Sequence, residues 1–323
     1  MLKKILTVAV MAAMVCVLLT VGVSAAEYLN QDFENGFDVF MANNNPPEGA
    51  ARVEVLEGDN TVAFFDNQTA SALQNRINST ATNLPKGGVM MFDFKTGQKV
   101  DNGYIYVEFH RGTIDDAKPK CVFQLTAVQH DDDTWYTYII TMNEDCTESM
   151  VYRKKRDTQE PFAFVANATT PTNGEATAMW RMYTVKHDCY FDNIRIFSGV
   201  FAKDVLFSMD GSEVNGIDDI TAGTLTAELN IVCGDVTKET EDNGATYFAK
   251  GSKATPMVVF FDKNMRMVNC TQVVSDLNVG DNQVSIEVDT TEFADKLEGG
   301  FAGLYVLDDM MNIRPLSDAV ELR

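Results

Sequence analysis

Residues 104–111 read YIYVEFHR, and the alternation of side chains in this stretch decides the fold class. In a β-strand, successive side chains point to opposite faces, so every second residue shares a face. One face of this stretch is apolar and carries Ile105, Val107 and Phe109. The other face carries Tyr104, Tyr106, Glu108 and His110. One apolar and one polar face is typical of a strand in a sheet that covers a core on one side only.

Short segments of the same kind recur along the chain, between clusters of Gly, Asp and Asn that are typical of turns. The expected strands before residue 198 are 53–56, 62–65, 89–95, 104–111, 121–130, 134–142, 150–153, 162–165, 179–185 and 190–197. No segment shows a sustained 3.6-residue apolar period, so helices are not expected to form the core. Many short strands at near-regular spacing favour a β-sandwich of the jelly-roll type.

A break at Ser198-Gly199-Val200 separates this region from a second, shorter series of strands. These are expected at 205–209, 224–233, 246–249, 257–262, 267–274, 283–288 and 302–308, with one helical turn within 291–297. About seven strands over this length are typical of an immunoglobulin-like sandwich. The predicted fold is therefore all-β: a jelly-roll β-sandwich at residues 27–199, followed by a smaller immunoglobulin-like β-sandwich at 204–323.

Residues 1–26 have the order of a secretory signal peptide. Lys3 and Lys4 are followed by an uncharged apolar run at 5–21 and by small residues at Ser24-Ala25-Ala26. This order predicts cleavage after Ala25 or Ala26. The alternative is a membrane anchor, which the short apolar run disfavours. We therefore expect a secreted, extracellular protein with no membrane insertion after cleavage.

The net charge limits the partners that the chain can bind. Removing Lys3 and Lys4 with the signal peptide lowers the net charge from −21 to −23. Nucleic acid is an unsuitable partner, because phosphate binding needs clustered Lys and Arg. Anionic lipid is disfavoured for the same reason. Such acidity suits a soluble extracellular protein, and it also suits cation binding.

Cysteine usage excludes a dense disulfide framework. The cysteines beyond the signal peptide are Cys121, Cys146, Cys189, Cys233 and Cys270. Their number is odd, so at least one has no partner within the chain. We expect mostly buried free thiols, and one bridge between Cys233 and Cys270 stays open as an alternative.

Three short motifs give the first region a family resemblance. Residues 32–36 read DFENG, residues 135–139 read WYTYI, and residues 190–196 read YFDNIRI. Such motifs resemble those of the jelly-roll carbohydrate-binding modules and concanavalin-like domains of secreted bacterial proteins. The resemblance spans about residues 27–198 and implies sugar binding. It also places Trp135 in the core.

The second region is similar to an immunoglobulin-like accessory domain found at the C-terminus of many secreted proteins of Gram-positive anaerobes. The similarity lies in residues 258–262 (VVFFD), 301–308 and 311–316 (MNIRPL). The last strand of that family usually has a Trp where this chain has Val306 or Leu307. Such domains imply a spacer or a packing partner rather than a catalyst.

The jelly-roll resemblance also implies a structural calcium ion between the first and last strands of the first region. The matching carboxylates are Glu34 and Asp192. Calcium prefers oxygen ligands of this kind. Alternatively, Glu34 caps a turn and Asp192 is a plain strand-end acid. Residues 131–133 (DDD) form a second acidic cluster, which we interpret as a solvated hairpin tip because neighbouring strand residues diverge.

The polar face of residues 104–111 is the main candidate for ligand binding. Flat aromatic rings can stack on the apolar face of a sugar, while carboxylates and amides bind its hydroxyls. We therefore predict a site made of Tyr104, Tyr106, Glu108 and His110, joined from other strands by Gln124, Trp180 and Arg181. Alternatively, the tyrosines pack under a loop and Trp180 belongs to the core.

No catalytic signature accompanies this face. The sequence has no Gly-x-Ser-x-Gly, no His-Glu-x-x-His and no phosphate loop. We interpret His110, His130 and His187 as surface residues rather than bases. The sequence therefore favours a secreted, non-catalytic carbohydrate-binding or cell-surface accessory protein, with a polysaccharide or cell-surface partner. The alternatives are a polysaccharide lyase or glycoside hydrolase on the same fold, and an adhesion protein without a sugar site.

Overall fold

The computed structural model describes most of the chain beyond the signal peptide. The described residues are 25–37, 40–42, 51–56, 60–65, 74–79, 82–83, 88–97, 104–111, 120–125, 130–131, 133–142, 148–168, 177–185, 188–240, 247–308, 315–317 and 319–323. The predicted signal peptide lies outside them, except for Ala25 and Ala26. Among the described residues no helix is long and apolar enough to cross a bilayer.

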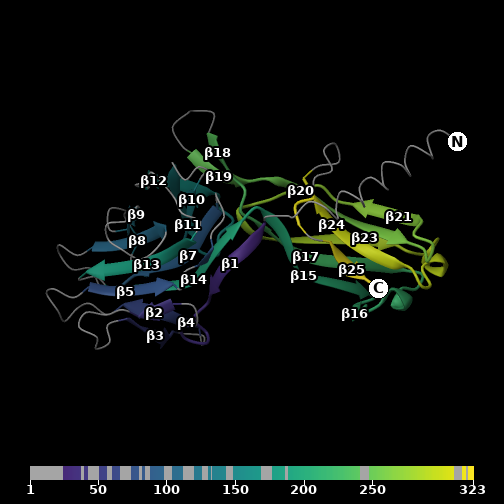
Figure 1. The fold of residues 1–323 in the computed structure, drawn as a ribbon, viewed down its shortest axis with the longest axis horizontal. Helices are drawn as coiled ribbons and strands as arrows, with labels where there is room; N and C mark the ends of the chain where they lie inside the picture. Colours follow the sequence, from purple (N-terminus) through teal and green to yellow (C-terminus); the bar gives the residue numbers. More distant parts are fainter. Residues whose placement is uncertain are drawn as a thin grey trace. The chain divides into compact units, whose positions relative to one another are not determined.

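The all-β prediction is confirmed, and the chain divides into two compact units. The first unit comprises Glu27–Ser198 and Val236–Lys250, and the second includes Gly199–Asp235 and Gly251–Arg323 (Figure 1). The described helices are two 3₁₀ turns, η2 (Ile217–Asp219) and η3 (Ala294–Lys296). The second of these falls within the helical turn expected at 291–297.

The first unit contains a larger and a smaller antiparallel sheet. In the described residues, the order of the larger sheet is β18 (Val236–Thr240), β19 (Tyr247–Gly251), β12 (Phe162–Asn167), β11 (Ser149–Lys155), β10 (Tyr136–Met142), β7 (Gly88–Thr96), β14 (Cys189–Ser198), β4 (Thr61–Phe65) and β3 (Ala51–Val55), with β1 (Ala26–Gln31) also on β14. The smaller sheet has the order β2 (Phe40–Ala42), β5 (Gln74–Ser79), β13 (Thr177–Val185), β8 (Tyr104–Arg111) and β9 (Lys120–Gln124), with β6 (Thr82–Asn83) on β13.

The core of the first unit follows from the alternation in these strands. The larger sheet contributes mainly aromatic rings, among them Phe92 and Tyr138, whose stacked centroids lie 5.4 Å apart. The smaller sheet contributes aliphatic side chains such as Ile105, Val107 and Met182 to the same cluster. Burial of these apolar surfaces between two sheets is the main stabilising contribution, at roughly 25 cal/mol per Å².

A hairpin encoded late in the chain completes the larger sheet. β19 pairs with β12, through Phe162 with Ala249 and Ala163 with Phe248 (Figure 1). The chain passes between the units at 26–27, 198–199, 235–236 and 250–251. The boundaries expected from the sequence, 27–199 and 204–323, do not include this return of the chain to the first unit.

The second unit is also a sandwich of antiparallel sheets. One sheet in the described residues has the order β16 (Ser212–Glu213), β15 (Val200–Met209), β17 (Thr224–Cys233) and β23 (Gly280–Asp289). The other has the order β21 (Met267–Gln272), β20 (Lys253–Phe261), β24 (Phe301–Leu307) and β25 (Val320–Leu322), with β22 (Ser275–Asp276) on β20. Its immunoglobulin-like topology stays a prediction.

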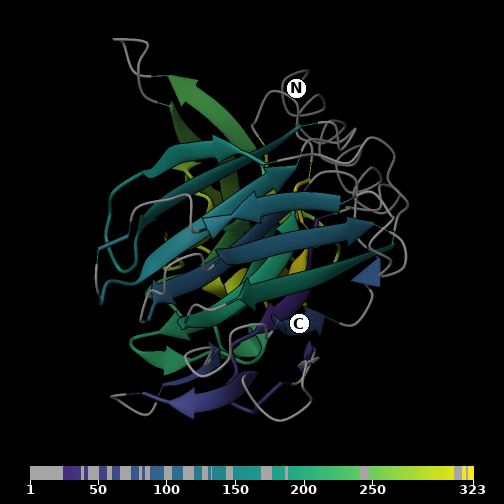
Figure 2. The same ribbon diagram turned by 90° about the vertical axis from the view of Figure 1, so that its left-hand side faces the viewer.

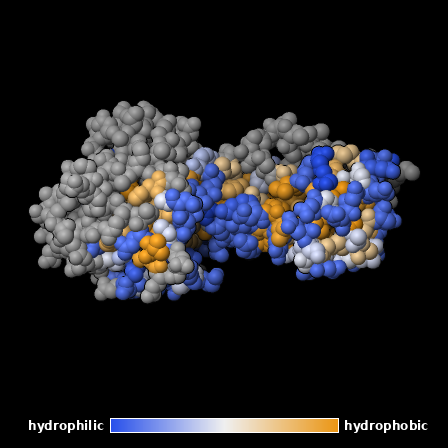
Figure 3. Space-filling view, turned by 90° about the horizontal axis from the view of Figure 1, so that it is seen from below, coloured by the Kyte–Doolittle hydropathy of each residue, from blue (hydrophilic) through white to orange (hydrophobic). Residues whose placement is uncertain are grey.

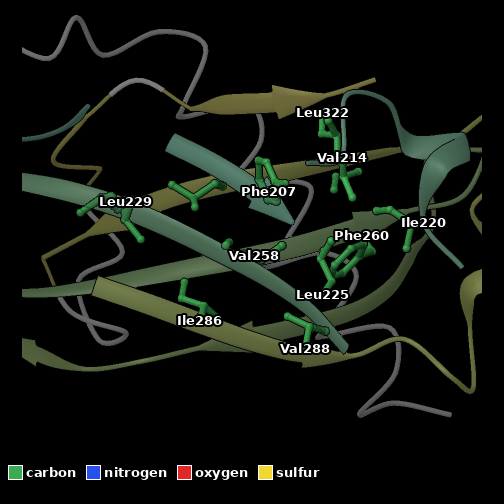
Figure 4. Close-up of a cluster of buried hydrophobic side chains, with 14 of the residues drawn as sticks. Phe207, Val214, Ile220, Leu225, Leu229, Val258, Phe260, Ile286, Val288 and Leu322 are labelled. Carbon is green, nitrogen blue, oxygen red and sulfur yellow. The ribbon is translucent and has the colours of Figure 1, made fainter. Parts of the chain in front are cut away.

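The second core is aliphatic with few aromatic rings. Leu225, Leu229 and Ile286 from β17 and β23 face Val258 and Phe260 from β20 (Figure 4). The six residues Met257, Val259, Phe261, Phe301, Tyr305 and Leu307 form a separate apolar cluster from β20 and β24. Hydrophilic residues cover most of the described surface seen in Figure 3, with smaller apolar patches between them. This surface fits the strong net charge.

Three cysteines whose side chains the structure describes are free thiols. Cys189 and Cys233 are buried, and Cys270 is exposed. Burial raises the pKa of the Cys233 thiol, whose Sγ lies 3.4 Å from the carbonyl oxygen of Asp235. The open alternative of a Cys233–Cys270 bridge is therefore wrong, whereas the expectation of free thiols holds for these three residues.

Candidate ligand-binding face

The site predicted on residues 104–111 lies on the face of β8 that is turned away from the core. Ile105 and Val107 are buried in the core of the first unit. Tyr106, which alternates with them, is half-buried. β8 lies between β13 and β9 in the smaller sheet, and Figure 2 shows the strands of the first unit side by side. The polar set of β8 is therefore flanked by residues of both neighbours.

The strand register decides which of the predicted residues come together. Tyr106 pairs with Gln124 on β9 and with Tyr183 on β13. Glu108 pairs with Arg181 on β13. Directly opposed residues of an antiparallel pair share a face, with Cβ atoms about 4.5–5.5 Å apart. Tyr106, Glu108, Gln124 and Arg181 therefore form one continuous group, of which Gln124 is exposed.

Glu108 and Arg181 form a buried ion pair. Arg181 donates through Nη1 to Oε2 of Glu108 over 3.3 Å, and their side chains are only 7% and 8% exposed. Glu108 is therefore buried, although its position has the parity of the face turned away from the core. A buried carboxylate needs a partner to offset its desolvation, and the guanidinium of the next strand supplies it. The pair fixes the orientation of both groups beside Tyr106.

Trp180 occupies a position on the other side of the sheet. It pairs with Phe109 of β8, one residue away from the Arg181–Glu108 pair. Since neighbouring strand residues alternate between faces, Trp180 and Arg181 cannot share one face. Trp180 therefore has the opposite parity to Arg181 in the register, and its part in the site stays a prediction. Tyr104 and His110 pair with Val185 and Met179 and keep the parity of Tyr106.

The two carboxylates predicted to bind calcium are held by consecutive residues at the start of β4. Glu34 accepts a hydrogen bond from the backbone N–H of Thr61 over 3.0 Å. Asp192 accepts one from Nδ2 of Asn60 over 3.1 Å. Glu34 is exposed, whereas Asp192 is buried. The two carboxylates therefore bind neighbouring residues of the chain, Thr61 and Asn60.

Asp192 is already surrounded by nitrogen donors. Its Oδ1 accepts the backbone N–H of Asn193 over 2.8 Å, and its Oδ2 lies 3.3 Å from Nη1 of Arg156. Asp93, its register partner on β7, lies 3.5 Å from the same Nη1 and accepts from Thr137 and Asn193. Burial raises the pKa of both carboxyls, while the nearby donors oppose that shift. A guanidinium thus supplies the counter-charge.

These residues, as placed, do not fit a calcium ion. Calcium takes six to eight oxygen ligands, whereas Asp192 is bound by two nitrogen donors besides Arg156. Among the described residues, no group of three or more His, Cys, Asp or Glu side chains could hold a metal. Calcium at Glu34 and Asp192 stays a prediction of the sequence.

A row of aromatic and basic residues crosses the outer face of the larger sheet, and the sequence reasoning missed it. The rings of Tyr190 and Phe64 are stacked with their centroids 4.6 Å apart. Nζ of Lys95 lies 5.6 Å from the centroid of the Tyr190 ring. Arg156 covers Trp135 at 4.8 Å. Trp135 is half-buried here and not a core residue, contrary to the resemblance. These ring–ring and cation–ring contacts pack the side chains of this row against one another.

His130 belongs to a packed cluster at the start of β10. Its Nε2 lies 2.6 Å from the hydroxyl oxygen of Tyr138, to which Arg153 also donates. Burial raises the pKa of Tyr138 to about 12. His130 is half-buried among Phe94, Tyr136 and Tyr138, so it is packed more closely than a fully exposed surface residue.

The acidic hairpin tip behaves as a solvated surface at its two described residues. Asp131 is exposed and lies 3.1 Å from Nζ of Lys155. Asp133 is exposed and lies 2.8 Å from Nζ of Lys95. Each carboxylate has its own lysine, so the tip is neutralised by ion pairs rather than arranged around a metal.

Comparisons with known proteins give a weak likeness of fold only. No protein-family model matches the chain, and no curated protein matches it in sequence. Similar solved structures include a sialidase, with a TM-score of 0.37, 12% identity, and 53% of this chain and 18% of that one covered. The K3 adhesin domain of Lys-gingipain from Porphyromonas gingivalis has a TM-score of 0.32 and 17% identity, covering 54% and 100%. A Lotus tetragonolobus seed lectin has a TM-score of 0.36 and 6% sequence identity, with 54% of this chain and 97% of the lectin chain covered.

Proposed function

We propose that the chain is an extracellular carbohydrate-binding protein without catalytic activity, and that its binding face is formed by β8, β9 and β13. The observation that carries the proposal is the register of these strands. It brings a half-buried aromatic ring, an exposed amide and a fixed Glu–Arg pair onto one face outside the core. We define the binding face by Tyr106, Glu108, Gln124 and Arg181.

Each part of the binding face suits a sugar. Tyr106 offers an apolar ring with a polar tip at a low ordering cost, because its side chain has few rotatable bonds. Gln124 supplies both a donor and acceptors for hydroxyl groups. The Glu108–Arg181 pair is held by its own ion pair, so it does not have to be ordered when a ligand binds. Aromatic stacking with oriented polar groups discriminates sugars by shape and hydroxyl pattern.

The proposal includes secretion, which rests on the order of residues 1–26 in the sequence. It also includes an accessory role for the second unit. The geometry of Glu108 and Tyr138 does not favour the alternative of a lyase or hydrolase. Glu108 is tied to Arg181, and Tyr138, with its pKa near 12, stays protonated at neutral pH.

A glycan array probed with the secreted protein tests the proposal. We expect binding to at least one polysaccharide, and we expect Tyr106→Ala to abolish that signal. Tyr190→Ala is the matched control, because Tyr190 is equally half-buried but lies on the larger sheet. Circular dichroism confirms that both variants are folded. Absence of binding to every glycan, or equal loss in both variants, would exclude this face as a sugar site.

A further inference from the structure

We propose that the second unit binds a second copy of this chain along the outer edge of β21. In this dimer the two β21 strands pair antiparallel across a two-fold axis near Cys270, so that one sheet continues from copy to copy. The inference goes beyond the proposed function and does not depend on sugar binding. It rests on the hydrogen bonding of β21, on its lack of charge and on the apolar side chains that it exposes.

β21 is the last strand of its sheet. In the part of the chain that the structure describes, the sheet runs from β25 through β24 and β20 to β21, and no strand follows (Figure 1). β21 pairs with β20 from Phe261 with Met267 to Met257 with Gln272, and the pairing is regular from Asn269 onwards. An edge strand of this kind presents backbone N–H and C=O groups with which another strand can pair.

The hydrogen bonds show which residues present these groups. Val273 donates its N–H to the carbonyl oxygen of Pro256 on β20 over 3.0 Å. In an antiparallel pair, alternate residues bond to the same neighbour. Cys270 and Gln272 therefore direct their backbone groups away from β20. In agreement, the N–H of Cys270 is accepted by Oδ1 of Asn269 over 2.8 Å. These outward groups form the outer edge of β21.

The outer edge of β21 lacks the charges that usually protect an edge strand. Residues 267–274 read MVNCTQVV and contain no charged side chain. Charged residues on edge strands oppose pairing with another chain. The other three strands that end the described sheets of the second unit all carry carboxylates: Glu213 on β16, Asp281, Glu287 and Asp289 on β23, and Glu321 on β25. In a chain with a net charge of −21, β21 is therefore the edge at which two copies repel one another least.

Exposed apolar side chains gather beside this edge. Among the described residues, five large apolar side chains are exposed, and three of them are Met265, Met267 and Val274. Their exposed fractions are 65%, 37% and 64%. All three lie on β21 or within two residues of it. Since exposed apolar surface is removed from water when a partner binds, its concentration at one edge indicates an interaction site.

The charges at the two ends of this stretch favour a second copy as the partner. The turn before β21, at residues 262–266, carries one acidic and two basic residues, among them the exposed Lys263 and Arg266. The exposed Asp276 follows at the other end. Antiparallel pairing about a two-fold axis places the beginning of one strand beside the end of its copy. Opposite charges therefore meet at both ends, and the uncharged residues meet between them.

Cys270 lies within the paired stretch and has the properties of an intermolecular contact. Its thiol is free and exposed, whereas Cys189 and Cys233 are buried. The chain beyond the predicted signal peptide has an odd number of cysteines, which in a secreted protein suggests a contact between chains. A two-fold axis near Cys270 places the two thiols close together, so this residue reports on the pairing.

Sedimentation equilibrium of the secreted protein tests this inference, at about 1 to 100 μM protein and under reducing conditions so that no disulfide contributes. We expect the mass of a dimer at the upper end of this range. Cys270→Glu should weaken the dimer at least tenfold, because like charges then face one another across the axis. Cys270→Ser adds no charge and should keep the dimer. Leu206→Glu adds the same charge at another exposed position of the second unit and should also keep it.

Cross-linking with a short bis-maleimide locates the axis. We expect covalent dimers of the wild-type protein and none of Cys270→Ser. A monomer at every concentration overturns the inference. A dimer that Cys270→Glu does not weaken, or that Leu206→Glu weakens equally, overturns its assignment to β21, and cross-linking that persists in Cys270→Ser overturns the position of the axis. If Cys270→Glu fails to fold, hydrogen exchange of residues 269–272 decides: it should slow as the wild-type protein is concentrated, and unchanged exchange overturns the pairing.

Discussion

Glu108 and Arg181 form a buried ion pair between β8 and β13. Their side chains are nearly inaccessible, and each removes the charge penalty of the other. The alternation of residues 104–111 predicted that Glu108 lies outside the core. It could not predict the burial, because that depends on β13 being the neighbour of β8, and strand order is not encoded in a local pattern.

Removing one partner of this pair should lower the free energy of unfolding, whereas replacing both partners by apolar side chains should lower it less. We expect Glu108→Gln or Arg181→Gln to lower the free energy of unfolding by about 3 kcal/mol, since each leaves one buried charge without its counter-ion. The double variant Glu108→Leu/Arg181→Met should lose less than the sum of the two. Urea unfolding of the four proteins measures this. Additive losses would mean that the two side chains do not interact.

Asp93 and Asp192 predict a pH dependence of definite sign. Burial raises the pKa of both carboxyls above 3.8, so the folded state takes up their protons before the unfolded state does. Their contribution to stability therefore increases as the pH falls through their folded-state pKa values towards 3.8, and it is lost as the pH rises again.

The comparison of wild type with Asp192→Asn isolates this contribution, because the amide cannot titrate. Between pH 7 and pH 4, the wild-type protein should gain stability relative to Asp192→Asn, as measured by thermal unfolding at each pH. If the wild-type protein instead loses stability relative to Asp192→Asn over this range, the Arg156 ion pair outweighs burial and the folded-state pKa of Asp192 is lowered.

At the scale of elements, hydrophobic patterning found the central strands and missed polar ones. Residues 89–95 and 190–197 were predicted, and they lie within β7 and β14. β5 reads QNRINS and has one core residue, Ile77. Nothing in such a segment indicates a strand until its neighbour β13 is known. Residues 236–239 of β18 and 201–204 of β15 were missed for the same reason, since their side chains are half-buried or exposed.

The hairpin of β18 and β19 should be required by the larger sheet. In the secreted protein, Ala249→Pro removes a backbone N–H within β19, where Ala249 is buried and pairs with Phe162. We expect hydrogen exchange of residues 162–167 to accelerate at least tenfold, while residues 224–233 of β17 stay protected. Lys250→Ala loses only an exposed ion pair with Glu239 and should exchange as wild type does.

Two results would contradict this role of the hairpin. If residues 162–167 keep their protection in Ala249→Pro, the sheet does not depend on β19. If residues 224–233 of β17 lose protection together with residues 162–167, the effect of the hairpin is not confined to the larger sheet.

At the scale of the whole molecule, the prediction of secretion rests on the composition and on the first 26 residues. The fold adds contacts next to the predicted cleavage site. Glu27 at the start of the predicted mature chain accepts a hydrogen bond from Nε of Arg195 over 2.6 Å. Gly199 has a φ of +64°, and an added methyl group would lie 2.7 Å from Cβ of Ala25. Close packing follows the chain up to the predicted cleavage site.

N-terminal sequencing of the secreted protein should therefore begin at Ala26 or Glu27. Glu27→Ala should lower the melting temperature by a few degrees, because the buried guanidinium of Arg195 loses that carboxylate. A mature protein that still carries residues 5–21 would contradict the prediction of secretion by cleavage.

The binding face is the central claim, and a calorimetric titration tests it most directly. The secreted protein and its Tyr106→Ala and Tyr190→Ala variants are titrated with the polysaccharide that gives the strongest array signal. We predict an affinity at least tenfold lower for Tyr106→Ala, equivalent to about 1.4 kcal/mol, and an unchanged affinity for Tyr190→Ala. An unchanged affinity in Tyr106→Ala, or a loss confined to Tyr190→Ala, would contradict the assignment of sugar binding to β8, β9 and β13.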